Sequence, residues 1–240
     1  MKKIVIAGML TIGMSLFAEV SLKNSTNVDQ LGFASLLEHV EKVDHAKAGG
    51  WYLYHLENKL YKSVVNNEFE IQDAIASAYK KLLVEVEKNK PLLNDEFYIT
   101  MIKQYGKYNF EEHYFPINGM MKESSTWKVS GDKVVSWSSD SLIIKFDNTD
   151  ENLNKLHLEK DKAKELLSKD KNRNLKLKYI FKIKSIDVDF ASRIEGCSDK
   201  FSRCSKITPS VVGHIVRVEV TDTNTKNRAH IATIVYNKEK

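Results

Sequence analysis

The densest group of acid and imidazole side chains in the sequence is Glu111-Glu112-His113, set among aromatic residues. Neighbouring carboxyl groups can act as general acid and general base when their surroundings separate their pKa values. An extended segment is predicted over 108–117, and in a strand Glu111 and Glu112 point to opposite faces. Only Glu111 and His113 could therefore act together, as the catalytic pair of a hydrolase. A solvated strand edge is the alternative interpretation.

No other motif points to catalysis. The sequence contains no G-x-S-x-G, S-x-x-K, glycine-rich phosphate loop or EF-hand loop. Its seven histidines, at positions 39, 45, 55, 113, 157, 214 and 230, do not have the spacing of a metal site. We expect no metal and no cofactor, and a non-enzymatic protein is favoured over an enzyme.

Four lysines, Lys176, Lys178, Lys182 and Lys184, alternate with mostly apolar residues along a predicted strand over 175–184. Residues two apart share a face of a strand, so these ammonium groups are expected on one side of the sheet. Such a face could bind anionic phospholipid or lipopolysaccharide headgroups. It could equally be a solvated face, or an edge strand whose lysines prevent edge-to-edge pairing.

Two tryptophans are predicted to face each other across a hairpin. If Gly131-Asp132-Lys133 forms the loop of a hairpin over 125–139, Trp127 lies opposite Trp137. The pair could stack against a sugar ring, or it could cover the core. Both tryptophans are therefore candidate binding residues.

Cys197 and Cys204 are the only cysteines, and a disulfide between them is expected in an oxidising compartment. A redox site is more often C-x-x-C, and a zinc site needs further ligands. The disulfide would close a loop within 191–210. A long ordered loop of this kind is a candidate for contact with a partner.

The first eighteen residues match a secretory signal peptide. Lys2 and Lys3 precede an uncharged apolar run from Ile4 to Phe17, and Ala18 is followed by a polar stretch. Cleavage after Ala18 is expected, with an uncleaved membrane anchor as the alternative. The mature chain would then be periplasmic or secreted and have no transmembrane span.

The net charge does not point to nucleic acid. Loss of Lys2 and Lys3 with the signal peptide would lower the formal net charge from +5 to +3. Only five basic residues are arginine, the residue that nucleic-acid readers use for bidentate contacts. No nucleic-acid partner is expected of an exported chain with this composition.

Hydrophobic periodicity predicts an α+β fold, with about three helices followed by a mainly antiparallel sheet with one short inserted helix. The predicted helices cover 29–43, 51–65, 67–90 and 159–169, with a break at Ala48-Gly49-Gly50 and an N-cap at Asn67. The predicted strands cover 97–105, 142–146, 175–184, 212–220 and 231–236. Segments 19–94 and 95–240 are expected to form one compact domain.

Together these features predict an exported binding or accessory protein of a bacterial envelope. Its expected partner is an anionic envelope component or another envelope protein. The alternatives are an envelope hydrolase that uses Glu111 and His113, and a released factor that contacts the surface of another organism.

Overall fold

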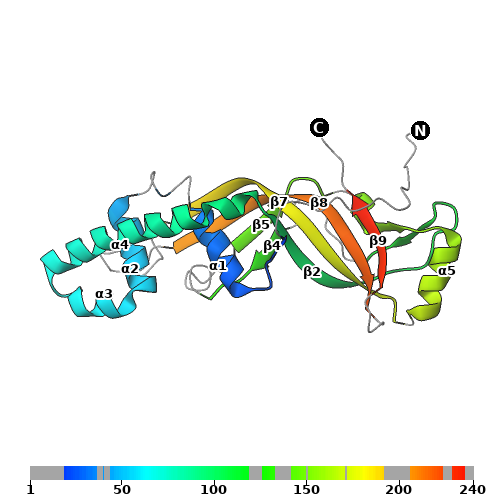
Figure 1. The fold of residues 1–240 in the computed structure, drawn as a ribbon, viewed down its shortest axis with the longest axis horizontal. Coiled ribbons are helices and arrows are strands. Elements are labelled where there is room, and N and C mark those ends of the chain that lie inside the picture. The colour runs from blue at the N-terminus through cyan, green and yellow to red at the C-terminus, as the bar shows by residue number, and fades with distance from the viewer. Residues whose placement is uncertain are drawn as a thin grey trace.

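The computed structural model describes residues 19–36, 40, 44–118, 126–132, 142–149, 151–170, 172–191, 206–223 and 229–235. These residues form an elongated α+β structure, in which helices extend from one end of a twisted sheet and one more helix lies at the other end (Figure 1). The predicted signal segment, Trp137, Cys197 and Cys204 lie outside the described residues. No helix in the described ranges is long and apolar enough to cross a membrane.

The helical part differs from the prediction in its number of helices. Within the described residues, four α-helices lie between the first strand of the sheet, at Glu19–Ser21, and the next strand: α1 (Ser25–Ala34), α2 (His45–Leu56), α3 (Asn58–Val64) and α4 (Glu68–Asn89). The side chains of Asn24, Asp44 and Asn67 accept hydrogen bonds from backbone N–H groups in the first turns of α1, α2 and α4. The predicted N-cap at Asn67 is therefore confirmed. The inserted helix is α5 (Lys160–Lys169).

The main sheet is mixed, and the expectation of a mainly antiparallel sheet needs correction at two places. The strands are β1 (Glu19–Ser21), β2 (Glu96–Gln104), β4 (Thr126–Val129), β5 (Leu142–Phe146), β7 (Asn174–Ala191), β8 (Lys206–Asp222) and β9 (His230–Val235). Their order is β1-β2-β7-β8-β5-β4, and β9 also pairs with β8. β1 is parallel to β2, and β5 is parallel to β8.

Smaller elements complete the fold. A short 3-10 helix η1 (Lys90–Asn94) leads from α4 into β2, and a second, η2 (Glu151–Asn154), precedes β6 (Lys155–His157). β6 pairs with β3 (Tyr114–Pro116) in a separate two-stranded sheet. This small sheet and α5 lie at the end of the molecule opposite α2 and α3 (Figure 1).

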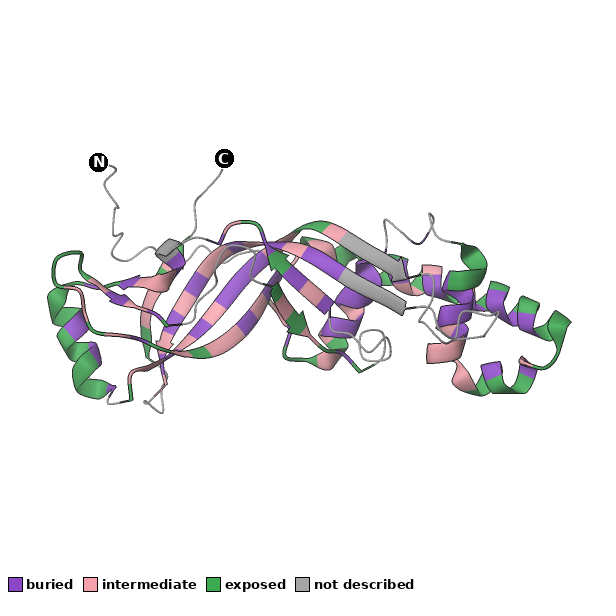
Figure 2. Ribbon diagram, turned by 180° about the vertical axis from the view of Figure 1, so that it is seen from behind, coloured by how far each residue is buried: buried purple, intermediate pink, exposed green. Residues whose placement is uncertain are grey.

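Apolar side chains form two clusters. The larger one joins one face of the main sheet to α1, α5 and the second half of α4, and it includes the fully buried Phe97, Tyr179 and Phe181. The smaller one lies among α2, α3 and the first half of α4, around Leu53 and Ile71. Buried and less buried residues alternate along the strands (Figure 2), as expected of a sheet with one covered face. We call the other face of the sheet the outer face.

The break predicted at Ala48-Gly49-Gly50 is wrong, because these residues lie inside α2. A Cβ atom on Gly49 would lie 2.4 Å from the backbone oxygen of Ile75 and 3.1 Å from the Cβ of Tyr79, both on α4. The missing side chain therefore permits α2 and α4 to approach closely. Glycine has a poor helix propensity, and the sequence alone therefore indicated a break. The packing of α2 against α4 offsets this propensity here.

We expect Gly49→Ala to lower the free energy of unfolding by about 1 to 3 kcal/mol, because the new methyl group meets backbone that cannot move without separating the helices. Ser77→Ala, on the exposed side of α4, is the control and should leave stability within about 0.5 kcal/mol. Denaturant unfolding followed by circular dichroism measures both. A Gly49→Ala variant as stable as the wild type would contradict the close approach.

Candidate functional site

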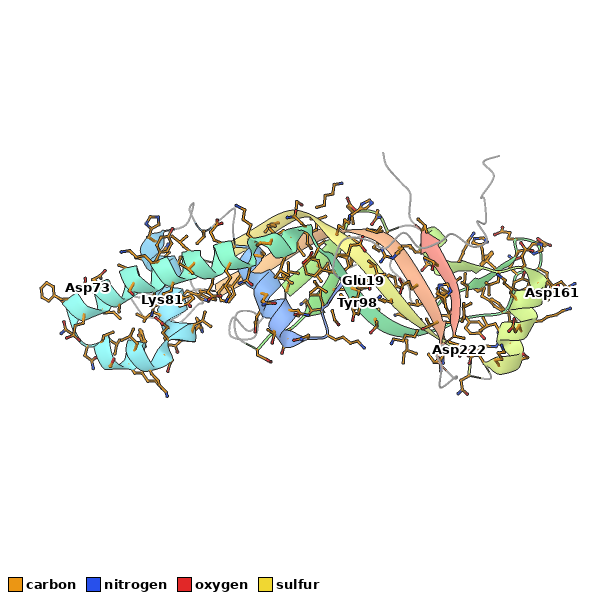
Figure 3. All side chains as sticks on the ribbon, viewed as in Figure 1. Glu19, Asp73, Lys81, Tyr98, Asp161 and Asp222 are labelled. Atoms are coloured by element: carbon orange, nitrogen blue, oxygen red, sulfur yellow. The ribbon has the colours of Figure 1, made fainter. Side chains whose placement is uncertain are left out.

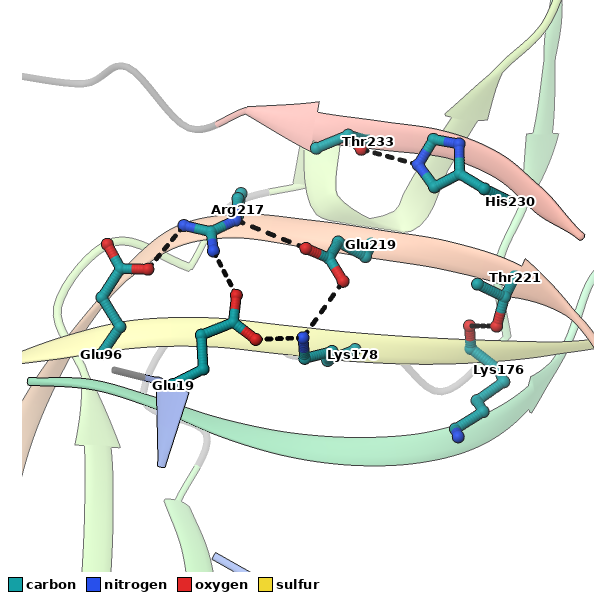
Figure 4. A network of polar contacts seen from close by, with 9 residues as sticks. All are labelled: Glu19, Glu96, Lys176, Lys178, Arg217, Glu219, Thr221, His230 and Thr233. Atoms are coloured by element: carbon teal, nitrogen blue, oxygen red, sulfur yellow. Dashed lines mark hydrogen bonds and ion pairs between the residues drawn. The ribbon is translucent and has the colours of Figure 1, made fainter. Parts of the chain in front are cut away.

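A network of ion pairs occupies the outer face of the sheet where β1, β2, β7 and β8 lie side by side (Figure 4). Arg217 contacts Glu96 at 2.7 Å and Glu19 at 2.5 Å. Lys178 pairs with Glu19 and, at 3.3 Å, with Glu219, and its ammonium group lies 4.7 Å from the ring centre of Tyr98. We call Glu19, Glu96, Lys178, Arg217 and Glu219 the ion-pair network.

The charges in this network depend on one another. Partial burial alone raises the pKa of Glu19, but hydrogen bonds and charges from Lys178 and Arg217 outweigh it, so its pKa lies below the ordinary value. Burial alone lowers the pKa of Arg217, yet the carboxylates of Glu96 and Glu19 raise it overall. A carboxylate with a lowered folded-state pKa stabilises the fold above its ordinary pKa, and that contribution is lost as the pH falls through the folded value.

The predicted lysine face is mostly neutralised by nearby acids. Lys178 belongs to the network, Lys182 lies 3.8 Å from Glu96, and Lys184 lies 2.6 Å from Asp147. Lys176 differs, because no ion pair of its ammonium group is found among the described residues. Opposite charges on neighbouring strands thus leave Lys176 as the lysine of this set that is available to a ligand.

A depression of about 490 Å³ lies beside Lys176, at the end of the sheet where β7 lies between β2 and β8. Its wall is formed by residues of β2, β7, the end of β8 and the turn after β1: Lys23, Thr100, Met101, Ile102, Lys176, Asp222 and Thr223. We call it the edge depression, because β2 continues past the end of β1 at this point. Figure 3 places Asp222 at the end of the sheet far from α2, α3 and α4.

The edge depression combines cationic, hydroxyl and apolar groups. The ammonium group of Lys23, like that of Lys176, has no ion pair within the described part of the chain. Asp222 is almost wholly buried, and its backbone N–H donates to the carbonyl of Ala229. Ile102 is 67% exposed. The depression can therefore offer two ammonium groups, the hydroxyl of Thr100 and an apolar contact to a ligand, whereas the hydroxyl of Thr223 already donates to the carbonyl oxygen of Asn174 at 2.9 Å.

Glu111 and His113 lie in an exposed turn over 110–113, which interrupts the extended segment predicted over 108–117; only its end, Tyr114–Pro116, forms a strand, β3. The turn forms because the side chain of Asn109 accepts hydrogen bonds from the N–H groups of Glu111 and Glu112 at 2.9 and 3.0 Å. His113 has a left-handed backbone with φ 57° and lies 3.4 Å from the hydroxyl of Tyr108. No hydrogen bond between Glu111 and His113 is found in the described chain.

Trp127 packs against the core and pairs across β4 and β5 with Ile144, while its predicted partner Trp137 lies outside the described residues. Its ring centre lies 5.0 Å from those of Phe146 and Tyr179. Asp132, expected in the hairpin loop, is held to α1 by hydrogen bonds from its N–H to Asp29 and from the Ser25 hydroxyl. The return strand of the predicted hairpin lies outside the described residues.

Sequence reasoning missed several residues of the edge depression and the network. The sequence could have indicated Ile102, because it is an apolar residue at a position that the alternation of the strand assigns to the outer face. No sequence feature indicates Lys23, because its position beside Thr100 depends on the pairing of β1 with β2. The buried partner of Arg217, Glu96, likewise depends on strand order.

The described residues hold no group of three or more potential metal-ligating side chains. His214 and His230, both on the last strands, have separate partners: His214 contacts Asp147 at 2.8 Å, and His230 contacts Thr233. Neither the edge depression nor the network supplies the ligand set of a metal centre.

Comparisons with known proteins match the chain to a family. A family model described as a domain of unknown function (DUF4852) matches residues 46–169. This range covers the helices from α2 to α5 and the strands from β2 to β6. No curated protein and no solved structure matches.

Arg217→Met is expected to lower the free energy of unfolding by about 3 to 5 kcal/mol, because it leaves the carboxylate of Glu96, whose side chain is 5% exposed, without its guanidinium partner. Glu96→Gln combined with Arg217→Met should recover part of the loss, since no buried charge then remains unpaired. Lys169→Met, which breaks an exposed pair with Glu165, is the control and should change stability by less than about 1 kcal/mol. Chemical denaturation measures all three, and equal losses for Arg217→Met and Lys169→Met would contradict the importance of the network.

Proposed function

The chain belongs to the family of the domain of unknown function DUF4852. Since the family gives no function to carry over, we propose one from the residues of the chain itself. The protein is exported, periplasmic or secreted, and acts by binding an anionic group of an envelope component or envelope protein in the edge depression. The observation that carries this proposal is the pair of ammonium groups, Lys23 and Lys176, in one depression without an ion pair among the described residues.

The export part rests on the amino-terminal sequence. The charged start, apolar run and small residue at Ala18 fit a secretory signal peptide. Strand β1 begins at Glu19, directly after the expected cleavage point, and Glu19 is held by Arg217 and Lys178. Cleavage after Ala18 would therefore leave every described element intact.

The binding part rests on charge. An ammonium group without a carboxylate partner keeps its attraction for an anion, whereas one that is already paired must first exchange that partner. Lysine also binds phosphate and carboxylate groups as a compact point charge, without the fixed geometry that arginine requires. The edge depression thus fits a phosphate or carboxylate group attached to a partly apolar ligand, whose apolar part would contact Ile102.

We expect Lys23→Gln combined with Lys176→Gln to abolish most of the salt-sensitive retention of the purified protein on sedimented cell-envelope fractions. Loss of two phosphate or carboxylate contacts should weaken retention by about tenfold or more at low salt. Lys62→Gln, which removes one positive charge from the exposed side of α3 at the other end of the molecule (Figure 1), is the control and should be retained like the wild type. Unchanged retention of the double variant would exclude the edge depression as the binding site.

If the protein is exported, its signal peptide should be removed. Protein recovered from the periplasm or the culture medium of cells that express the full sequence should begin at Glu19 when its terminus is sequenced. Recovery from the medium alone would favour the released factor that contacts another organism's surface. An unprocessed chain confined to the cytoplasm would contradict export.

A further inference from the structure

The outer edge of β2 is only partly paired. At one end the edge is covered by β1, and the N–H of Leu22 donates to the carbonyl oxygen of Tyr98 at 3.1 Å. At the other end the carbonyl oxygen of Gln104 accepts from the N–H of Asn118 at 2.8 Å. Between these two hydrogen bonds, β2 continues without a neighbouring strand on this side in the described chain.

The direction of the free backbone groups follows from these two bonds. In an antiparallel ladder, alternate residues direct both N–H and C=O to the same edge. Because Tyr98 and Gln104 use this edge, Thr100 and Ile102, which lie between them in the same alternation, direct their backbone groups there too. Met101 and Lys103 instead face β7, with which the whole of β2 pairs.

The free stretch coincides with the edge depression, since Thr100, Met101 and Ile102 form part of its wall. Lys23 marks the end of the stretch nearest β1, and Lys176 lies opposite Ile102 on the neighbouring strand β7. Backbone donors and acceptors that pair with no described strand, two ammonium groups and an exposed apolar side chain thus meet in one place.

We propose that this edge binds an extended, acidic peptide segment of a partner protein, which adds a strand to β2 beyond the end of β1. The inference rests on the proposed function and specifies its ligand. Backbone hydrogen bonds to Thr100 and Ile102 would supply affinity, and an Asp, Glu or C-terminal carboxylate facing Lys23 and Lys176 would supply specificity.

A peptide can form more of the interactions that the edge depression offers than a lipid headgroup can. A phosphate or other headgroup could pair with the two lysines but would not match the alternating donors and acceptors of a strand edge. An extended chain matches them in register, because its own groups repeat with the same spacing. Charge complementarity makes the segment acidic, and the contact of Ile102 favours an apolar residue beside the acid.

The first experiment measures binding of the full chain to an immobilised array of capped pentapeptides of varied sequence. We expect the bound peptides to be enriched in Asp and Glu together with β-branched residues. Copies of the tightest binders in which every backbone nitrogen is methylated should bind at least about tenfold more weakly, since the loss of one or two hydrogen bonds is enough for that change. No binding, no acidic enrichment, or equal binding of methylated copies would overturn the inference.

The second experiment changes the protein. Ile102→Pro removes a backbone donor that faces the open edge and leaves the ladder with β7 in place, as proline at an edge position permits. Ile102→Ala removes the same side chain but keeps the N–H, and it is the matched control. We expect Ile102→Pro to weaken binding of the tightest peptides about tenfold relative to Ile102→Ala. Equal affinities would overturn the added strand.

The same measurements separate this inference from the proposed function. If Lys23→Gln with Lys176→Gln loses retention on envelope fractions while peptides fail to bind wild type, the anionic site survives and the peptide ligand is wrong. Vesicles of anionic phospholipid, used as a probe in parallel, would then show whether a headgroup is the ligand. If the double variant keeps its retention, the proposed function fails as well.

Discussion

The pairing of β7 with β8 is the constraint on which the rest of the structure depends. These two strands, 18 and 17 residues long, are matched from Leu175 with Asp222 to Ala191 with Lys206. β2 attaches along β7, while β5 and β9 attach to different parts of β8. Register shifts after Ile180 and Ile183 leave one residue unmatched at each point, which bends the pair and adds twist. Every other strand of the main sheet is placed by this curved pair, directly or through one neighbour.

The ion-pair network follows from that arrangement. A sheet covered on one face exposes polar side chains on the other, and neighbouring strands bring them within reach of one another. Glu96, Lys178 and Arg217 come from three adjacent strands, and Glu19 from the short strand beyond them. Glu96 is almost fully buried, so its charge requires the guanidinium group of Arg217. The network also explains why a row of lysines in the sequence does not produce a uniformly cationic face.

The edge depression arises because β1 is much shorter than β2. Three residues of β1 cover the start of β2, and the chain then turns into α1, whose N-cap at Asn24 begins the helix at once. The turn carries Lys23 to the point where the edge of β2 becomes free, and the register of β7 brings Lys176 to the same place. A binding surface thus results from the early end of one strand and not from a motif.

The sequence by itself determined the α+β class, the N-cap at Asn67, the strand at 142–146 and the inward face of β7, because each depends on periodicity or on groups a few residues apart. Tertiary structure decided the helix through Gly49, the turn at Glu111 and the pairing of Lys178, Lys182 and Lys184. Each of these depends on which segment lies alongside, and that is a property of strand order and helix packing. Lys176 was visible in the sequence as a cation. Only the strands beside it determined that it, together with Lys23, keeps a charge available for a ligand.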